Sequence, residues 1–225
     1  MYRASIAIMV TGGIDSTTLM YLYKDKNPTL LTVDYGQSVF DKQIEMITFH
    51  SKKLGLNDPI TIKIEYFDWQ KKPGLFTKNF KPNEENPLAD YNKLRYENFF
   101  IEGRNMIMIA YALSYCSTMK IDELLTGYLY GEEEWTKRRT YKLMTGDNSP
   151  QFVDMMNLLT NVGLSYQTRL RAPYYENRQS KNEVIKLGRS LEIDYSKTYS
   201  CYFDPPCGVC DNCLLRESFL NEDEK

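Results

Sequence analysis

Histidine is almost absent from this sequence, since His50 is the single one among 225 residues. One histidine excludes a metal site built from several histidines. Its neighbours form no partner pattern, which argues against a histidine-based hydrolase triad. His50 falls within residues 44–54, where apolar residues recur on one helical face. We therefore predict that it lies on the surface or on a helix flank and has no chemical role.

The sequence also lacks long hydrophobic runs and an excess of positive charge. No apolar run approaches the roughly 20 residues that a membrane-spanning helix needs. The first ten residues, MYRASIAIMV, are more typical of a first strand than of a signal peptide. We therefore expect a cytoplasmic chain without a membrane partner. The net charge of −2 provides no general attraction to nucleic acid, while 42% hydrophobic residues suffice for a buried core.

Cysteine is scarce but concentrated in one window, SCYFDPPCGVCDNCLLR, which holds four of the five. Cys201, Cys207, Cys210 and Cys213 could supply four thiolates to one tetrahedral zinc ion. An iron–sulfur cluster also accepts four cysteines, and two disulfides would use all four. Regular CxxC steps in a chain expected in the cytoplasm disfavour the disulfides, so we predict a structural zinc knuckle. Cys116, inside an apolar stretch, is expected to be a small core residue.

The stretch VTGGIDSTT stands between an apolar run and a helix-like pattern. Two glycines allow a tight turn and a close approach to a ligand. The helix that follows would direct its first N–H groups and its positive dipole end at that ligand. The pattern therefore indicates an anion site, most simply for phosphate. An ordinary turn capped by Ser16 or Thr17 is the alternative.

Strand and helix patterns alternate along the chain. Strands are predicted at 5–10, 29–33, 60–64 and 123–127, with helices at 44–54, 106–116, 151–159 and 181–191; Gly55 is expected to end the first of these helices. The polar segment 68–98 predicts a long loop of the kind that acts as a lid. This alternation favours an α/β fold with a parallel sheet flanked by helices. Ligands of such sheets bind at the carboxyl ends of the strands, where residues 11–17 and 34–37 would both lie.

Five motifs carry a family resemblance: TGGIDSTT, DYGQ, GRNMIMIAYA, QSKNEVIKLG and residues 200–216. Together and in this order they resemble 7-cyano-7-deazaguanine synthase, a family of PP-loop enzymes of the queuosine and archaeosine pathways. The resemblance implies an adenine-nucleotide α-hydrolase-like PP-loop fold with a C-terminal zinc knuckle. It also implies that residues 1–195 form a PP-loop ATP-dependent ligase domain and that 196–225 form a C-terminal helical and zinc-knuckle segment of the same domain.

The implied reaction uses ATP and Mg²⁺ to activate 7-carboxy-7-deazaguanine as an acyl-adenylate. Ammonia then gives an amide, and a second adenylation with loss of AMP gives the nitrile. The resemblance places the nucleotide at Thr11, Gly12, Gly13, Asp15, Ser16, Thr17, Asp34, Tyr35, Gly36 and Gln37. It gives catalytic roles to Asp15, Ser16, Arg104 and Lys181, and substrate-binding roles to Arg104, Asn105, Tyr128 and Asp147. A homodimer is also implied.

The sequence departs from the family pattern in its substrate half. Ser38-Val39-Phe40 replaces an Arg-His pair, the segment around Asp147 lacks the expected Cys and Arg, and the step from Cys201 to Cys207 is short. The charged segment 130–139 is foreign to the pattern; it could form a solvated face or contact a macromolecular acceptor. These departures leave open a divergent paralogue that stops at the amide or joins the deazaguanine to a protein or nucleic-acid amine, as in phage DNA modification or antiphage defence.

Three other classes of protein compete with this interpretation. A PP-loop tRNA-modifying enzyme usually carries a basic surface or an extra RNA-binding domain, and the net charge of −2 and the short chain count against this class. A nucleic-acid-binding zinc finger would need Lys and Arg around the cysteines, where the sequence has mainly acidic residues. A structural protein with an inactive ATP site is disfavoured because both glycines, Asp15 and Ser16 are intact.

Overall fold

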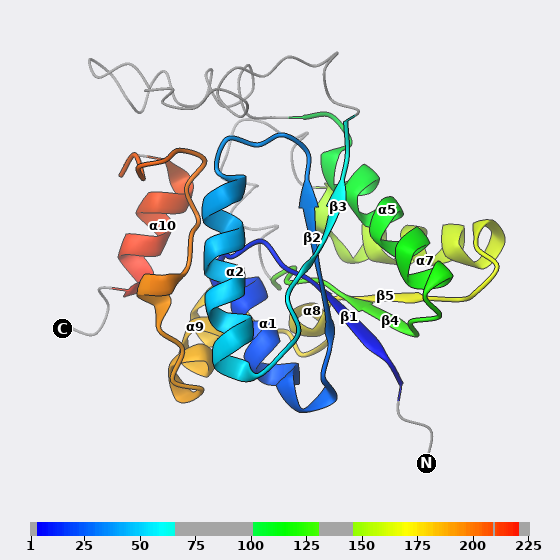
Figure 1. Cartoon of the computed structure of the whole chain (residues 1–225), viewed down its shortest axis with the longest axis horizontal. Helices are drawn as coiled ribbons and strands as arrows, with labels where there is room; N and C mark the ends of the chain where they lie inside the picture. The colour runs from blue at the N-terminus through cyan, green and yellow to red at the C-terminus, as the bar shows by residue number, and fades with distance from the viewer. Residues whose placement is uncertain (1–3, 66–100, 131–145, 209, 221–225) are drawn as a thin grey trace.

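A computed structural model describes residues 4–65, 101–130, 146–208 and 210–220 of the chain (Figure 1). Its centre is a five-stranded sheet in the order β3-β2-β1-β4-β5, and every neighbouring pair of strands is parallel. The strands are β1 (Ile6–Met9), β2 (Thr29–Asp34), β3 (Ile60–Lys63), β4 (Glu123–Leu125) and β5 (Arg169–Arg171). The predicted α/β class with a parallel sheet is confirmed.

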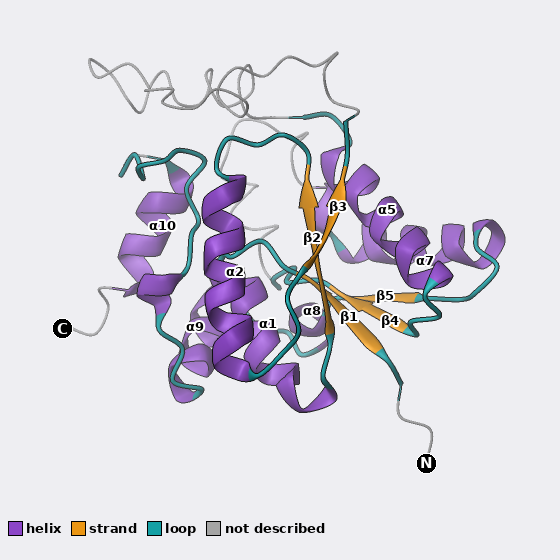
Figure 2. Ribbon diagram, in the orientation of Figure 1, coloured by secondary structure: helices purple, strands orange, loops and turns teal. Residues whose placement is uncertain are grey.

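Helices cover both faces of this sheet (Figure 2). One side carries α1 (Ile14–Tyr23), α2 (Phe40–Leu54) and α9 (Lys181–Ser190), with α10 (Asp211–Leu220) outside α2. The other side carries α5 (Arg104–Thr118) and α7 (Pro150–Gly163). The short elements are α8 (Pro173–Glu176), η1 (Lys24–Lys26), η3 (Gly146–Asn148) and η4 (Tyr195–Lys197).

The residues of β1 alternate between two apolar clusters, as a strand between two helical layers requires. Ile6 and Ile8 pack in a buried cluster that includes Leu19 of α1 and Ile47 of α2. Ala7 and Met9 pack in another cluster, which includes Ile109, Ala112 and Leu113 of α5. The central strand is thus buried on both faces and holds its carboxyl end, where the glycine loop begins, in a fixed place.

The strand order reverses beside β1, because β2 pairs with one of its edges and β4 with the other. The chain leaves β1 toward α1, and Gly127 follows β4. A Cβ atom on Gly127 would lie 3.2 Å from Cβ of Asp15, so the two loops touch. Ligands of open α/β sheets bind at the carboxyl ends of the strands beside such a reversal. The carboxyl ends of β1 and β4 are therefore the expected position of a site.

Most of the predicted elements are present, with shifted ends. The predicted helix 44–54 begins earlier, at Phe40, and ends as expected at Gly55, which is left-handed with φ of 66°. Cys116 is buried in the core, as predicted. The sequence patterns missed β5 and α8, which are three and four residues long and too short to show a period. The predicted loop 68–98 lies outside the described residues.

The prediction for His50 was wrong, because its side chain is fully buried rather than on a surface. Its Nε2 lies 2.9 Å from the carbonyl oxygen of Lys197, and its Nδ1 lies 2.9 Å from the hydroxyl of Tyr21. A carbonyl only accepts, so Nε2 carries the proton and Nδ1 accepts from the phenol. Two hydrogen bonds across three segments of the chain explain how an imidazole is accommodated in the core.

Within the described ranges, none of the helices combines the length and the apolar character that crossing a membrane would require.

Candidate functional site

The glycine loop after β1 is shaped by its contacts. Gly12 has φ of +72°, and a Cβ atom there would lie 2.9 Å from the carbonyl oxygen of Gln43 on α2. Only glycine fits this left-handed conformation at so close an approach. Gly13 then serves as the N-cap of α1 without a side-chain cap. The first N–H groups of α1 are left without a capping side chain, as an anion-binding helix end requires.

The hydroxyls of this loop fall into two groups. Ser16 Oγ lies 3.2 Å from the backbone nitrogen of Thr11, 3.3 Å from its Oγ1 and 3.3 Å from the carbonyl oxygen of Gly13. This hydroxyl therefore braces the turn. Thr17 is 1% exposed, and within the described part of the chain its Oγ1 has no hydrogen-bond partner. A buried hydroxyl without a partner is costly, so the loop fits a ligand that offers phosphate oxygens.

The side chains of Asp15 and Lys181 form an ion pair beside this loop, although 166 residues separate them. Lys181 Nζ lies 2.6 Å from Oδ1 of Asp15. Lys181 is the first residue of α9, whose start is fixed by a capping box between Ser180 and Glu183. The hydroxyl of buried Tyr174 donates a 2.9 Å hydrogen bond to the carbonyl oxygen of Asp15. A carboxylate and an ammonium, each partly exposed, thus stand beside the predicted phosphate site.

The segment after β2 is folded on itself. Asp34 Oδ1 accepts from the backbone N–H of Gly36 at 2.9 Å, and Gln37 Nε2 donates to the carbonyl oxygen of Val33 at 2.9 Å. Gln37 is buried and also donates to Gln43 of α2. The structure places all four residues, 34–37, at the carboxyl edge of the sheet as expected. The side chains of Asp34 and Gln37 shape the turn, because they accept hydrogen bonds from the backbone N–H groups of Gly36 and Tyr35.

Arg104 lies at the start of α5 in a polar cluster drawn from several segments. Its guanidinium carbon lies 6.0 Å from the ring centre of Tyr35, and a side-chain hydrogen bond joins the two. Burial disfavours the charged guanidinium, but the facing Tyr35, Tyr202 and Asp147 raise the pKa of Arg104 above its ordinary value. Burial also raises the pKa of Asp147, against the opposing charge of Arg104. The predicted pair Arg104 and Asp147 is thus brought together.

The other two predicted substrate residues, Tyr128 and Asn105, lie after β4 and on α5. Tyr128 follows β4, and its ring lies 6.4 Å from that of Phe152 on α7, edge to face. Asn105 is partly buried on α5 beside Arg104. Of the charged segment 130–139, only Tyr130 is described. Its ring lies 6.4 Å from that of Tyr175, and residues 131–139 lie outside the described ranges.

The sequence analysis missed four residues that the structure brings to the carboxyl end of the sheet: Gly127, Tyr174, Tyr199 and Tyr202. A glycine directly after an apolar strand was a readable signal for Gly127. The tyrosines carried no signal, because they are three of 18 in the chain and only the fold selects them.

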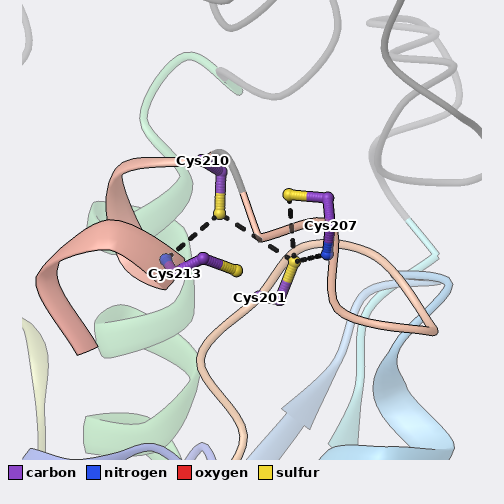
Figure 3. A group of neighbouring side chains, drawn as sticks. All are labelled: Cys201, Cys207, Cys210 and Cys213. Carbon is purple, nitrogen blue, oxygen red and sulfur yellow. Dashed lines mark hydrogen bonds between the residues drawn. The ribbon is translucent and has the colours of Figure 1, made fainter. Parts of the chain in front are cut away.

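The four predicted cysteines converge in one cluster (Figure 3). Their sulfur atoms all lie within 4.8 Å of one another, and Cys201 Sγ lies 3.6 Å from that of Cys207 and 3.9 Å from that of Cys210. Sulfurs around a tetrahedral zinc ion are about 3.8 Å apart when each Zn–S bond is about 2.3 Å. None of the four forms a disulfide. The cluster therefore has the donor set and the dimensions of a metal site.

The electrostatics of the cluster also suit a metal. Hydrogen bonds from the thiols of Cys201 and Cys210 lower the pKa of Cys213 below its ordinary value. The backbone N–H groups of Phe203 and Cys207 lie 3.3 and 3.4 Å from Cys201 Sγ. Such N–H groups stabilise a thiolate, which is the form that binds metals.

Comparison with known proteins places these features in a family. Residues 5–223 match the family model described as "Queuosine biosynthesis protein QueC". The chain is 29% identical to the 7-cyano-7-deazaguanine synthase of Methanococcus maripaludis over 95% of its own length and 93% of that protein. It is 26% identical to the enzyme of the same name from Methanobrevibacter smithii (96% and 92%) and 27% identical to that from Desulfotalea psychrophila (96% and 94%). The match spans the glycine loop, the Arg104 cluster and the cysteines, and the chain therefore belongs to the QueC family of queuosine biosynthesis proteins.

Proposed function

We propose that this chain is an ATP-dependent ligase that converts 7-carboxy-7-deazaguanine and ammonia into 7-cyano-7-deazaguanine. ATP would activate the carboxylate as an acyl-adenylate, releasing pyrophosphate, and ammonia would displace AMP to give the amide. A second adenylation, at the amide oxygen, and loss of AMP and a proton would leave the nitrile. The family membership and the names of the relatives support this reaction.

The observation that carries the proposal is the orphaned Thr17 hydroxyl at the start of α1. It lies in the first turns of the helix that follows the glycine loop, where the glycines, the uncapped helix end and the adjacent Lys181 all favour an anion. Activation of a carboxylate by ATP needs such a place for the departing pyrophosphate, because negative charge develops on it in the transition state.

The residues around the loop are proposed to bind different parts of Mg·ATP. Thr11, Gly12, Gly13, Ser16 and Thr17 would bind pyrophosphate through backbone N–H groups and hydroxyls, and residues 34–37 would flank the nucleotide. Asp15 has the hard oxygen ligands that Mg²⁺ prefers, and Lys181 would neutralise phosphate charge. When bound, Mg²⁺ would supply charge neutralisation at the phosphates.

The Arg104 cluster is proposed to hold the deazaguanine. Its guanidinium suits the carboxylate of the substrate, while Asp147 is an acceptor for the amide-like N–H groups of a guanine ring. Asn105 and Tyr128 would complete this side of the site. The metal of the four cysteines, proposed to be zinc, would be structural, since four thiolates leave no open position for substrate.

Other expectations from the sequence remain proposals of the same kind. They are a cytoplasmic location, a homodimer, an undivided domain with residues 1–195 as its ligase part and 196–225 as its knuckle segment, and contact of residues 130–139 with a macromolecular acceptor.

The test is to incubate zinc-loaded protein with Mg·ATP, ammonium and 7-carboxy-7-deazaguanine, and to follow AMP together with the mass of the product. We expect AMP and the nitrile mass. AMP with only the amide mass would contradict the second half of the reaction, and absence of AMP would overturn the proposed substrate.

A pair of variants ties the activity to the loop. Asp15→Asn keeps the size of the side chain but removes its charge, and we expect it to abolish pyrophosphate release. Asp25→Asn, at an exposed site in η1 just after α1, should leave release unchanged. Equal activity of both variants would remove Asp15 from the mechanism.

A further inference from the structure

Residues 195–203, which we call the strap, run from η4 to just past Cys201, the first cysteine of the cluster, and touch the glycine loop on the way. The backbone N–H of Tyr199 donates a 2.7 Å hydrogen bond to the carbonyl oxygen of Gly12. The carbonyl oxygen of Tyr199 lies 3.6 Å from where a Cβ atom of Gly13 would stand. Gly12 is also pressed against Gln43 of α2, so the loop is held between α2 and the strap.

The other end of the strap belongs to the cysteine cluster. Cys201 is part of the strap and lies two residues after Tyr199. The hydroxyl of Tyr199 donates to the carbonyl oxygen of Phe203, whose own N–H faces Cys201 Sγ at 3.3 Å. A metal ion bound by Cys201 would therefore fix the backbone that contacts Gly12, with only Ser200 in between.

Arg216 adds a second connection between the knuckle and the strap. It lies on α10, three residues after Cys213, and its guanidinium donates to Thr198 Oγ1 at 2.6 Å and to the carbonyl oxygen of Tyr195. Thr198 and Tyr195 are both buried, and the Tyr195 hydroxyl lies 3.4 Å from Thr18 Oγ1 in α1. A guanidinium group that donates hydrogen bonds to two oxygen atoms of the strap is well suited to hold the strap backbone in place.

We propose that the metal-loaded knuckle positions the glycine loop through the strap, with Arg216 as a positioning residue, so that metal binding and nucleotide binding strengthen each other. This inference rests on the proposed function in taking ATP as the ligand of the loop. Linkage is reciprocal: whatever factor the metal contributes to ATP affinity, ATP must contribute to metal affinity. The effect is expected at the nucleotide loop, away from the cysteines themselves.

The test uses the full chain loaded with zinc and a non-hydrolysable ATP analogue with Mg²⁺, with affinity measured by titration calorimetry. Arg216→Met should keep one zinc per chain but weaken analogue binding about 10-fold, within the usual range of coupling between sites. Thr198→Val removes one oxygen that Arg216 holds and should weaken binding in the same direction. Glu217→Gln, at the exposed neighbouring position on α10, is the matched control and should bind normally.

A second measurement on the unaltered protein does not depend on any variant folding. Competition with a zinc-binding indicator should show that the analogue raises zinc affinity by the same factor that zinc raises analogue affinity. Unchanged zinc affinity in the presence of bound analogue would overturn the inference, as would normal analogue binding by zinc-loaded Arg216→Met. Either result is compatible with nitrile synthesis. If the protein binds the analogue but forms no nitrile, the proposed function is refuted, while the coupling between zinc affinity and analogue affinity can still be measured.

Discussion

Lys181 Nζ lies 2.6 Å from Oδ1 of Asp15, which joins the first residue of α9 to the first turn of α1. The two side chains lie at the carboxyl end of the sheet, beside the point where the strand order reverses, and both are about one quarter exposed. A pair this accessible contributes about 1 kcal/mol or less to stability. Its position beside the glycine loop therefore points to a role in the reaction more than in folding.

Replacing Lys181 should consequently affect turnover much more than stability. Lys181→Met removes the positive charge proposed to face the phosphates, and we expect kcat to fall by about 100-fold or more, while unfolding by denaturant changes little. Lys186→Met, on the exposed face of the same helix, is the control and should keep wild-type kcat. A Lys181→Met enzyme with normal kcat would assign the ion pair to folding alone.

The left-handed Gly12 makes a second prediction, because a methyl group there meets both strain and the Gln43 carbonyl oxygen at 2.9 Å. Gly12→Ala should lower the free energy of unfolding by about 1–3 kcal/mol and should also weaken ATP binding. Gly55→Ala separates the two causes, since Gly55 has φ of +66° but nothing within 4 Å of the added atom. This control should lose only the strain energy and bind ATP normally. Equal losses for both variants in stability and in binding would show that the contact with α2 is unimportant.

Buried His50 makes stability depend on pH. Burial lowers the pKa of His50 below its ordinary value near 6.5, so the unfolded chain takes up a proton that the folded chain refuses. The stability is complete above pH 6.5 and falls as the pH drops below it, by at most about 1.4 kcal/mol per pH unit until the lowered pKa is reached. Denaturant unfolding between pH 7 and 5 measures this slope.

His50→Gln keeps polar atoms at this position but does not titrate, and its stability should vary less over the same interval. The carboxylates of Glu176 and Asp194 have lowered pKa values and lose their stabilising effect only at more acidic pH. Identical pH slopes for the two proteins would show that His50 does not control stability in this range.

Loss of one cysteine should remove the metal and destabilise the chain together. Cys210 is fully buried, and Cys210→Ser offers a hard oxygen in place of a thiolate. We expect less than one zinc per chain and a fall in Tm of roughly 4–8 °C, which corresponds to about 2 kcal/mol in a domain of this size. Cys116→Ser is the control for burial of a polar hydroxyl, because Cys116 is equally buried but lies outside the cluster; it should keep its zinc. A Cys210→Ser protein without metal but with an unchanged Tm would show that the knuckle does not stabilise the fold.

Asp147 provides a test of the substrate side. Asp147→Asn removes the carboxylate that faces Arg104, and we expect KM for 7-carboxy-7-deazaguanine to rise about 10-fold with KM for ATP unchanged. Asp154→Asn, exposed on α7, should leave both constants unchanged. A rise in KM for ATP instead would place Asp147 at the nucleotide.

The sequence alone determined the features that depend on neighbours along the chain. Apolar strands alternating with helical patterns, two glycines before a helix and the CxxC steps are local signals, and they predicted the parallel sheet, the anion site and the cysteine cluster. The tertiary structure decided which distant groups meet: Lys181 with Asp15, Arg104 with Asp147, His50 with Lys197, and Tyr199 with Gly12. The physical reason is that local patterns fix backbone conformation over a few residues. Contacts across 40 to 190 positions follow only from how strands order themselves in the sheet and how helices pack upon it.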